Sequence, residues 1–306
     1  MKQVRKDILD ILRRAQEAFM AQNYTKALED YHHIEKELAD SPKNLPAIWI
    51  EIGWNYYLLK EFSKAGPYFE MALGSPHINQ KQVFDCLRLT GFCYEFTDQP
   101  DKALAFLQDA LGQPLEEREK RYVLFEIGKI FYTQNLTKEA RPYLEKAIEH
   151  FSEDEAAYLR ANRYYLGFIL FYEKENREAE KLFERIITDA TTDSDKASGY
   201  FGIAHLLYEK RDFEELITCC KTITRLDSDF FDMETLAFFL CRSYLELEMW
   251  TELEVFLPNM IEHYAVGRYS VAYPQLQESL KQRKNLLVND TGDESSTEPS
   301  DPLLLN

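Results

Sequence analysis

The sequence predicts an all-α protein: a right-handed superhelix of about seven helical hairpins, followed by one capping helix. A small residue returns seven times at intervals of 37 to 39 residues, and a second position follows each one by twelve residues. Glycine and proline number only 11 each in 306 residues, and the apolar–polar alternation of strands is absent. Constant spacing within a block, with variable spacing between blocks, is typical of a rigid hairpin repeated along a solenoid.

Both recurring positions are occupied mainly by small residues, which lets two helix backbones approach closely. The first position is Ala15, Gly53, Gly91, Gly128, Gly167, Ala204 and Cys241. The second position is Ala27, Ala65, Ala103, Ala140, Ala179, Leu216 and Leu253. Because the last two members of the second set are leucines, we expect the helices of the last two hairpins to lie farther apart.

The second block shows how one hairpin is encoded. Pro46 suits the first turn of a helix, where its missing N–H leaves no hydrogen bond unmade. The first helix then carries an apolar face at helical spacing, formed by Trp49, Ile52, Gly53 and Tyr56. A second helix carries Ala65, Phe69 and Ala72, and ends before Pro76. We expect Phe69 and Tyr56 to fill the space where the two helices diverge.

The run from Trp49 to Pro76 resembles the tetratricopeptide repeat, whose usual period is 34 residues. Weaker copies in the same phase extend the resemblance over about residues 5–265. We assign residues 1–265 to seven repeats, at about 5–38, 45–76, 83–114, 120–151, 156–190, 195–227 and 232–264. Residues 266–288 are predicted to form the capping helix, and residues 289–306 a disordered acidic tail.

Composition restricts the partners. Acidic residues outnumber basic ones by 53 to 36, for a net charge of −17, which disfavours nucleic acids and anionic membrane surfaces. No apolar run approaches the roughly 18 residues of a membrane span, so we expect no membrane insertion and a cytoplasmic location. The five cysteines lie in apolar helical contexts and include no CxxC pair, which indicates buried, reduced thiols.

No catalytic or cofactor motif is present. The six histidines are scattered, and the sequence lacks HExxH, GxxxxGK[ST], GxGxxG and GxSxG. Paired carboxylates are abundant, but they fall in predicted loops and on solvated helix faces. We therefore predict a protein that is not an enzyme and that binds no cofactor and no metal ion.

A second, unusual apolar face on the first helices suggests a binding surface, because first helices line the concave side in proteins of the resembled family. Three rows of positions on this face contain mainly aromatic residues interspersed with four potential cations. The predicted groove residues are Trp54, Tyr57, Arg88, Phe92, Phe125, Lys129, Tyr132, Tyr164, Phe168, Phe171, Phe201, His205, Tyr208, Phe238 and Arg242. Aromatic and basic residues together suit a bound peptide that is oriented by a carboxylate.

Two functions remain open at this point. The first is a scaffold or adaptor that binds a partner protein or peptide, of unknown identity, in this groove. The second is a structural subunit of a larger assembly, or a self-assembling scaffold, that acts through the ends and the convex face of the solenoid. In the second case the aromatic rows only pack adjacent helices together, and homo-oligomers are possible. A variant of the first function, which the sequence does not distinguish from it, is regulation of a separately encoded enzyme through the tail or the groove.

Overall fold

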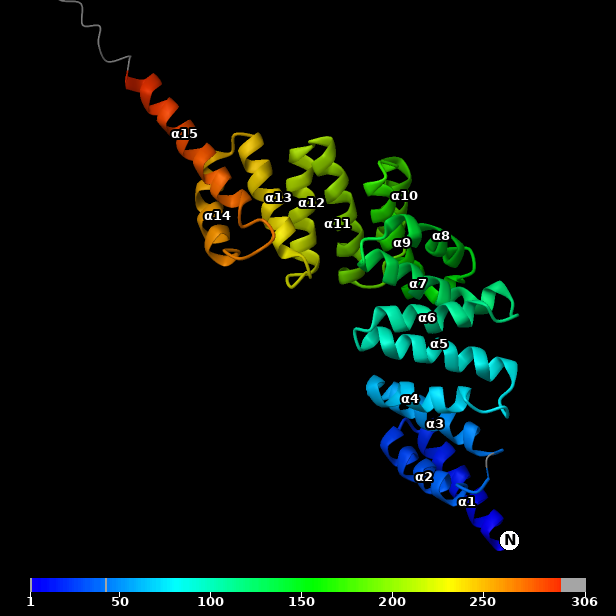
Figure 1. Ribbon diagram of the computed structural model, residues 1–306. Helices are drawn as coiled ribbons and strands as arrows, with labels where there is room; N and C mark the ends of the chain where they lie inside the picture. Colours follow the sequence, from blue (N-terminus) through cyan, green and yellow to red (C-terminus); the bar gives the residue numbers. More distant parts are fainter. Residues whose placement is uncertain (1, 42, 293–306) are drawn as a thin grey trace, which may run out of the picture. The chain divides into compact units, whose positions relative to one another are not determined.

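The computed structural model describes residues 2–41 and 43–292, with side chains for 7–41, 43–283 and 285, and this part is all-helical (Figure 1). The chain divides into two compact units, with the boundary between Ile169 and Leu170 inside one helix. The expected all-α architecture of consecutive helical hairpins is confirmed. None of the described helices has the length and hydrophobicity that crossing a membrane requires.

The first unit contains four hairpins and most of a ninth helix. Its helices are α1 (Lys2–Met20), α2 (Tyr24–Glu37), α3 (Leu45–Leu58), α4 (Phe62–Leu73), α5 (Gln80–Phe96), α6 (Pro100–Leu111), α7 (Arg121–Thr133), α8 (Thr137–Ile148) and α9 (Ala156–Tyr172). Short 3₁₀ turns, Glu117–Lys120 and Glu153–Glu155, precede α7 and α9. From α1 to α8 each helix packs on the next, and clusters of buried apolar side chains lie between the layers.

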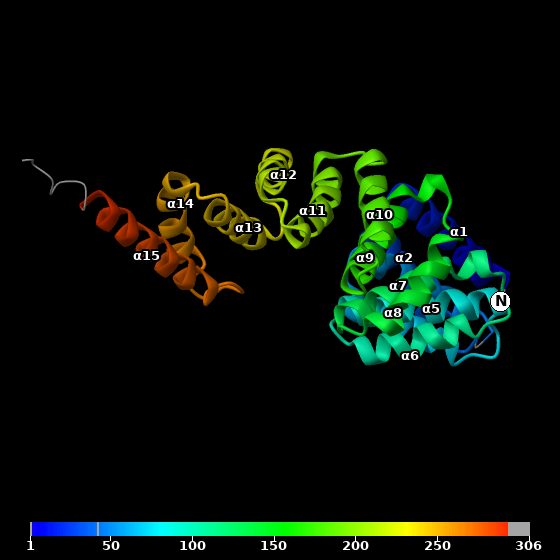
Figure 2. The same ribbon diagram turned by 90° about the horizontal axis from the view of Figure 1, so that it is seen from above.

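The second unit follows the same plan. Its helices are α10 (Asn176–Thr188), α11 (Asp193–Lys210), α12 (Phe213–Leu226), α13 (Met233–Glu246), α14 (Trp250–His263) and α15 (Ala272–Gly292). The last helix lies against α13 and α14 (Figures 1 and 2). Tyr273, Leu276 and Leu280 are buried in this contact. Helix α15 continues through Gly292, beyond the predicted end of the capping helix. The rest of the predicted acidic tail lies outside the described residues.

Each of the seven hairpin turns has the same backbone conformation. One residue has a positive φ between 56° and 68°: Gln22, Lys60, Asp98, Asn135, Lys174, Arg211 or Glu248. Each lies seven residues after the small residue of its hairpin. The next N–H bonds to the carbonyl five residues earlier, as from Glu61 to Tyr56 at 2.9 Å. This Schellman-type turn provides hydrogen bonds for carbonyl groups at the C-terminal end of the first helix. Because every hairpin uses the same turn, the two recurring positions are always twelve residues apart.

The small residues make room for a side chain of the opposite helix. A Cβ on Gly53 would lie 2.7 Å from the ring of Phe69, and a Cβ on Gly128 would lie 2.6 Å from Leu144 Cγ. Phe69 therefore packs directly over Gly53, and the expectation that it fills a diverging space is wrong. The ring of Tyr56 stacks on Tyr68 of α4, with centroids 5.8 Å apart, and its hydroxyl lies 3.1 Å from His32 Nε2 of α2 in the preceding hairpin.

The two leucines in the second recurring position have different consequences. Leu216 and Leu253 are both fully buried. The two helices of the last hairpin, α13 and α14, are in contact along less of their length than the two helices of each of the first four hairpins. This agrees with the expectation from the large side chain of Leu253. Helices α11 and α12 pack as closely as those hairpins, so the expectation is wrong for Leu216. The opposite position there is Ala204, which is smaller than Cys241 in the last hairpin.

Candidate functional site

The fifteen predicted groove residues fall into two classes of exposure. Four rings are buried, with 3–7% exposure: Phe92, Phe125, Phe168 and Phe201. The other eleven are half-buried: Trp54, Tyr57, Arg88, Lys129, Tyr132, Tyr164, Phe171, His205, Tyr208, Phe238 and Arg242. The four buried rings pack between helices, as Phe125 does against Phe151, Tyr158 and Tyr165. A partner can therefore reach only the half-buried set without rearrangement of the helices.

In the first unit the half-buried rings belong to a larger aromatic cluster. Tyr57 of α3 packs against Phe62 of α4, with ring centroids 5.3 Å apart, and against Trp54 at 5.7 Å. Phe62 stacks on Phe96 of α5 at 4.3 Å, and Phe96 is 52% exposed. Tyr57, Phe62 and Phe96, here called the aromatic cluster, join two consecutive hairpins. Sequence reasoning missed Phe62 and Phe96 because they lie outside the three rows, near the hairpin turns.

The cations of the first unit already have carboxylate partners. Arg88 Nη2 donates to Asp85 Oδ1 at 3.3 Å. Lys129 Nζ lies 3.2 Å from Glu95 Oε1 and 2.5 Å from Glu126 Oε2. Its ammonium group is also 5.9 Å from the centre of the Phe96 ring, beside the aromatic cluster. Two carboxylates thus surround one lysine, and this group carries a net charge of about −1 when all three are ionised.

Burial changes the titration of this group. It raises the pKa of Glu126 above its ordinary value, even though Lys129 lowers it. Burial lowers the pKa of Lys129, but Glu126 and Glu95 outweigh it, so the net shift is upward. Lys129 therefore stays protonated and paired at neutral pH. Asp85 and Glu126 are not among the groove residues predicted from the sequence, because the repeat positions do not show which side chains are in contact.

In the second unit the predicted rings are partly covered by the protein itself. Phe238 stacks on Tyr269, from the connection between α14 and α15, with centroids 4.1 Å apart. That connection is fixed by Arg268 Nη1, which donates to Asp232 Oδ2 at 2.9 Å. Tyr208 stacks on Phe239 at 4.7 Å. No pattern in the sequence indicates that Tyr269 returns to α13, because this segment lies outside the repeats.

The remaining predicted polar residues of the second unit also have contacts. Arg242 pairs with Glu246, whose other oxygen lies 2.7 Å from Arg211 Nη2. His205 packs among aromatic rings, with the Phe201 centroid at 4.8 Å and the Phe239 centroid at 5.0 Å. Burial lowers the pKa of His205 to about 4, so its ring is neutral at neutral pH. It is therefore not a cation that could orient an anionic guest.

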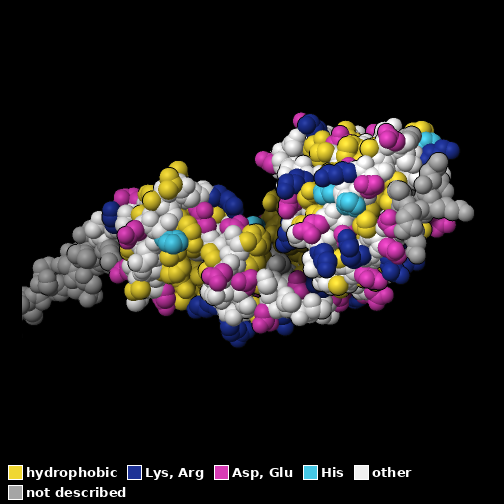
Figure 3. All heavy atoms as spheres, turned by 90° about the horizontal axis from the view of Figure 1, so that it is seen from below, with side chains coloured by type: hydrophobic (Ala, Val, Ile, Leu, Met, Phe, Trp, Pro, Cys, Tyr) yellow, Lys and Arg dark blue, Asp and Glu magenta, His cyan; other side chains and the backbone are white. Residues whose placement is uncertain are grey.

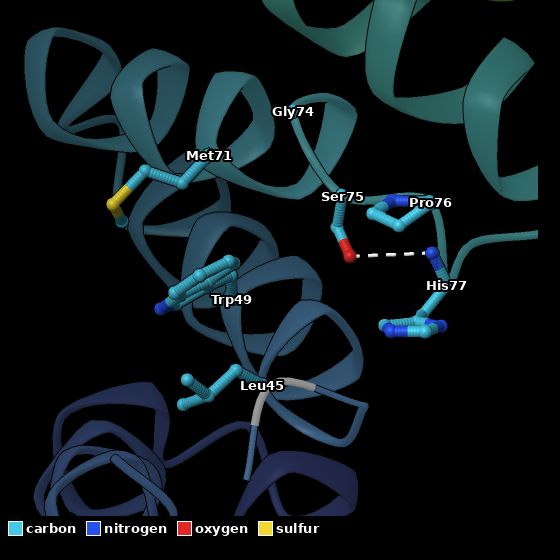
Figure 4. A pocket seen from close by; sticks show the side chains of 7 residues that line it. All are labelled: Leu45, Trp49, Met71, Gly74, Ser75, Pro76 and His77. Carbon is cyan, nitrogen blue, oxygen red and sulfur yellow. Dashed lines mark hydrogen bonds between the residues drawn. The ribbon is translucent and has the colours of Figure 1, made fainter. Parts of the chain in front are cut away.

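A shallow hollow of about 430 Å³ lies beside the second hairpin (Figure 4). Leu45 and Trp49 of α3 and Met71 of α4 line one side, and the turn at residues 74–77 lines the other. In that turn the backbone N–H of His77 donates to Ser75 Oγ at 3.2 Å. Trp49 Nε1 donates to Glu35 of α2 at 2.9 Å, so its polar edge is already satisfied.

The described part of the chain contains no candidate metal-binding cluster of His, Cys, Asp and Glu. The five cysteines are buried and free, and burial raises the pKa of Cys86, Cys93, Cys219 and Cys241 to about 12. On the face shown in Figure 3, hydrophobic side chains are interspersed with basic and acidic ones.

Known proteins share this architecture of consecutive helical hairpins. Residues 122–149, which cover nearly all of α7 and α8, match the family model described as tetratricopeptide repeat. Residues 122–149 therefore form a tetratricopeptide repeat, and the chain has the fold of solved tetratricopeptide-repeat structures. Its helices depart from the usual repeat mainly in the longer period. No curated protein matches the sequence.

Several solved structures are similar in fold. The apo form of RapI has a TM-score of 0.63 at 12% identity, over 89% of this chain and 85% of that chain. The C-terminal part of a TPR repeat-containing protein from Cytophaga hutchinsonii has a TM-score of 0.60 at 17% identity, over 86% and 98%. The apo form of the quorum sensor NprR from B. thuringiensis has a TM-score of 0.57 at 16% identity, over 85% and 76%.

Proposed function

We propose that this chain, with its tetratricopeptide-repeat fold, is a non-enzymatic scaffold that binds a partner protein or peptide. Repeats of this kind present extended surfaces that suit protein binding rather than catalysis. The observation that carries the proposal is the aromatic cluster of Tyr57, Phe62 and Phe96, which joins two hairpins and leaves Phe96 half exposed. Exposed aromatic rings beside buried ones are typical of binding hot spots.

The paired cations change the kind of partner that we expect. A peptide oriented by a carboxylate needs a free arginine or lysine, whereas Arg88 and Lys129 are each held by carboxylates. The Glu95–Lys129–Glu126 group places two carboxyl groups around the one ammonium group next to Phe96, so this lysine is not available to an anionic guest. We therefore propose a partner segment with an apolar or aromatic anchor and a neutral or basic neighbour.

An affinity capture with purified variants tests this proposal. Phe96→Ala combined with Tyr57→Ala should remove the partner from the captured material, as measured by quantitative mass spectrometry against the wild type. Val255→Ala is a matched control, because Val255 is 70% exposed on α14, far along the chain from the aromatic cluster. The proposal is wrong if the double variant keeps its helical circular dichroism and captures the same proteins as the control.

A further inference from the structure

A second hollow, of about 540 Å³, lies in the second unit between α12 and α14, with α13 as its floor. Met233, Leu236, Ala237, Leu240 and Tyr244 form the floor at helical spacing. The walls are Phe256, Met260 and Tyr264 of α14, and Lys221, Thr224 and Arg225 of α12. The hollow is thus apolar inside, with two basic residues on a single wall.

The last hairpin opens this hollow by a change in side-chain size. Ala237 lies four residues before the small residue of its hairpin. The same position in the other six hairpins is occupied by a larger side chain: Ile11, Trp49, Leu87, Leu124, Arg163 or Tyr200. The alanine leaves space on α13, and the looser approach of α13 and α14 keeps that space open.

The two basic residues of the wall are without acidic partners. Lys221 and Arg225 are one helical turn apart on α12, and both are exposed. Within the described residues neither forms an ion pair, whereas Arg88, Lys129, Arg242 and Arg268 all do. On a chain of net charge −17, two unpaired cations beside an apolar hollow favour an acidic guest with apolar side chains.

The C-terminal segment of this chain has that chemistry. Residues 293–306 lie outside the described structure, and their sequence contains Asp293, Glu294, Glu298 and Asp301, followed by Leu303, Leu304 and Leu305. The acidic residues precede three consecutive leucines, and the hollow offers cations beside apolar side chains. A guest with both features is already part of the molecule.

The extended segment is longer than the helix that forms the floor of the hollow. Leu303 lies eleven positions after Gly292, and these eleven Cα–Cα steps span about 36 Å when extended, compared with about 21 Å for the whole of α13. Helix α15 packs on α14, which forms one wall of the hollow, and on α13, which forms its floor. Tyr273 lies 6.3 Å from Tyr264 at the end of α14, and Arg283 lies 3.6 Å from Glu248 in the turn between α13 and α14. A tethered segment also has an effective concentration of about millimolar, which favours binding within one chain.

We propose that the hollow between α12 and α14 binds the chain's own C-terminal segment, with Leu303–Leu305 inside it and Glu298 and Asp301 beside Lys221 and Arg225. The C-terminus is then an internal ligand of the second unit. A partner protein that carries an acidic segment ending in leucines competes with it, so the segment regulates access to this surface.

The test places an environment-sensitive dye, acrylodan, on Asn306→Cys in the full chain, where the five native cysteines are buried. We expect dye emission to be blue-shifted relative to the free labelled peptide 293–306. Ala237→Leu fills the hollow and should abolish that shift, whereas Ala105→Leu, at an exposed position of α6, should keep it. Equal emission from both variants, or from the chain and the free peptide, overturns the proposal.

A charge-exchange experiment provides a second test that does not depend on whether the Ala237→Leu variant folds. Lys221→Glu with Arg225→Glu changes two exposed residues and should also abolish the blue shift. Adding Glu298→Lys and Asp301→Lys to that variant should restore it, and failure to restore it overturns the charge pairing. The shift should not depend on protein concentration. A shift that grows with concentration, together with dimers in light scattering, overturns binding within one chain in favour of a second copy.

Discussion

Gly128→Ala tests whether the small residue of the repeat is required by packing. The ideal Cβ at this position would lie 2.6 Å from Leu144 Cγ, 2.8 Å from Leu144 Cδ2 and 3.3 Å from the Ala140 carbonyl oxygen. Leu144 is fully buried and belongs to the hairpin core, so it has little room to move. Such overpacking costs about 1–3 kcal/mol, and the higher helix propensity of alanine offsets about 1 kcal/mol. We expect Gly128→Ala to be less stable than the wild type by up to about 2 kcal/mol.

Gly66→Ala is the matched control, since Gly66 is also buried inside a helix. Its Cβ would lie 3.5 Å from Cys93 Cβ, which is an ordinary van der Waals contact. Helix propensity then dominates, and we expect Gly66→Ala to stabilise the protein by about 0.5–1 kcal/mol. The two variants should therefore shift the melting temperature in opposite directions.

The assay is thermal unfolding followed by circular dichroism at 222 nm, with urea unfolding as a second measurement. A change of 1 kcal/mol corresponds to roughly 2–4 °C for a domain of this size. Because repeat proteins can unfold in parts, the first transition is the one compared. If Gly128→Ala melts at or above the wild-type temperature, the glycine is not required by the packing of Leu144 and the reasoning fails.

Three further predictions follow. The pKa of His205 is lowered to about 4, so its contribution to stability is present above its unfolded pKa of about 6.5 and is lost as the pH falls toward 4. Between pH 7.5 and 4.5, the free energy of unfolding should fall by about 2–3 kcal/mol less in His205→Phe than in the wild type. Equal losses in both proteins, measured by thermal melts, would contradict this. Lys60 has φ 61°, so Lys60→Gly should stabilise by up to about 1 kcal/mol, whereas Lys64→Gly inside α4 should destabilise by a similar amount, as measured by urea unfolding. The native protein should not react with a thiol reagent until it unfolds, because burial raises the pKa of every cysteine, and fast labelling of Cys86, Cys93, Cys219, Cys220 or Cys241 at neutral pH would contradict this.

Sequence reasoning predicted the hairpins well because their determinants are local. The interval of twelve residues reflects one turn geometry, which Lys60 and Asn135 adopt at equivalent places without glycine. Helical periodicity also identified the faces of the first helices. It could not separate buried from half-buried members of a row, such as Phe92 and Trp54, because both point in similar directions from their helices.

The contacts of the candidate site were less predictable. Lys129 was predicted to be available to a guest, yet it lies between Glu95 of α5 and Glu126 of its own helix. The i, i+3 spacing of Glu126 and Lys129 could have indicated a pair, because such residues are neighbours on a helix surface. The contact with Glu95 depends on how two hairpins are offset, which no periodicity specifies.

The sequence by itself determined the all-α architecture, the hairpin turns and the small residues over which opposite side chains pack, because each follows from interactions between residues close in the chain. Only the tertiary structure decided which cations are paired, that Tyr269 covers Phe238, and that Ala237 leaves a hollow between α12 and α14. These features depend on the distance and rotation between neighbouring helices, which are set by the packing of whole side chains across the interface.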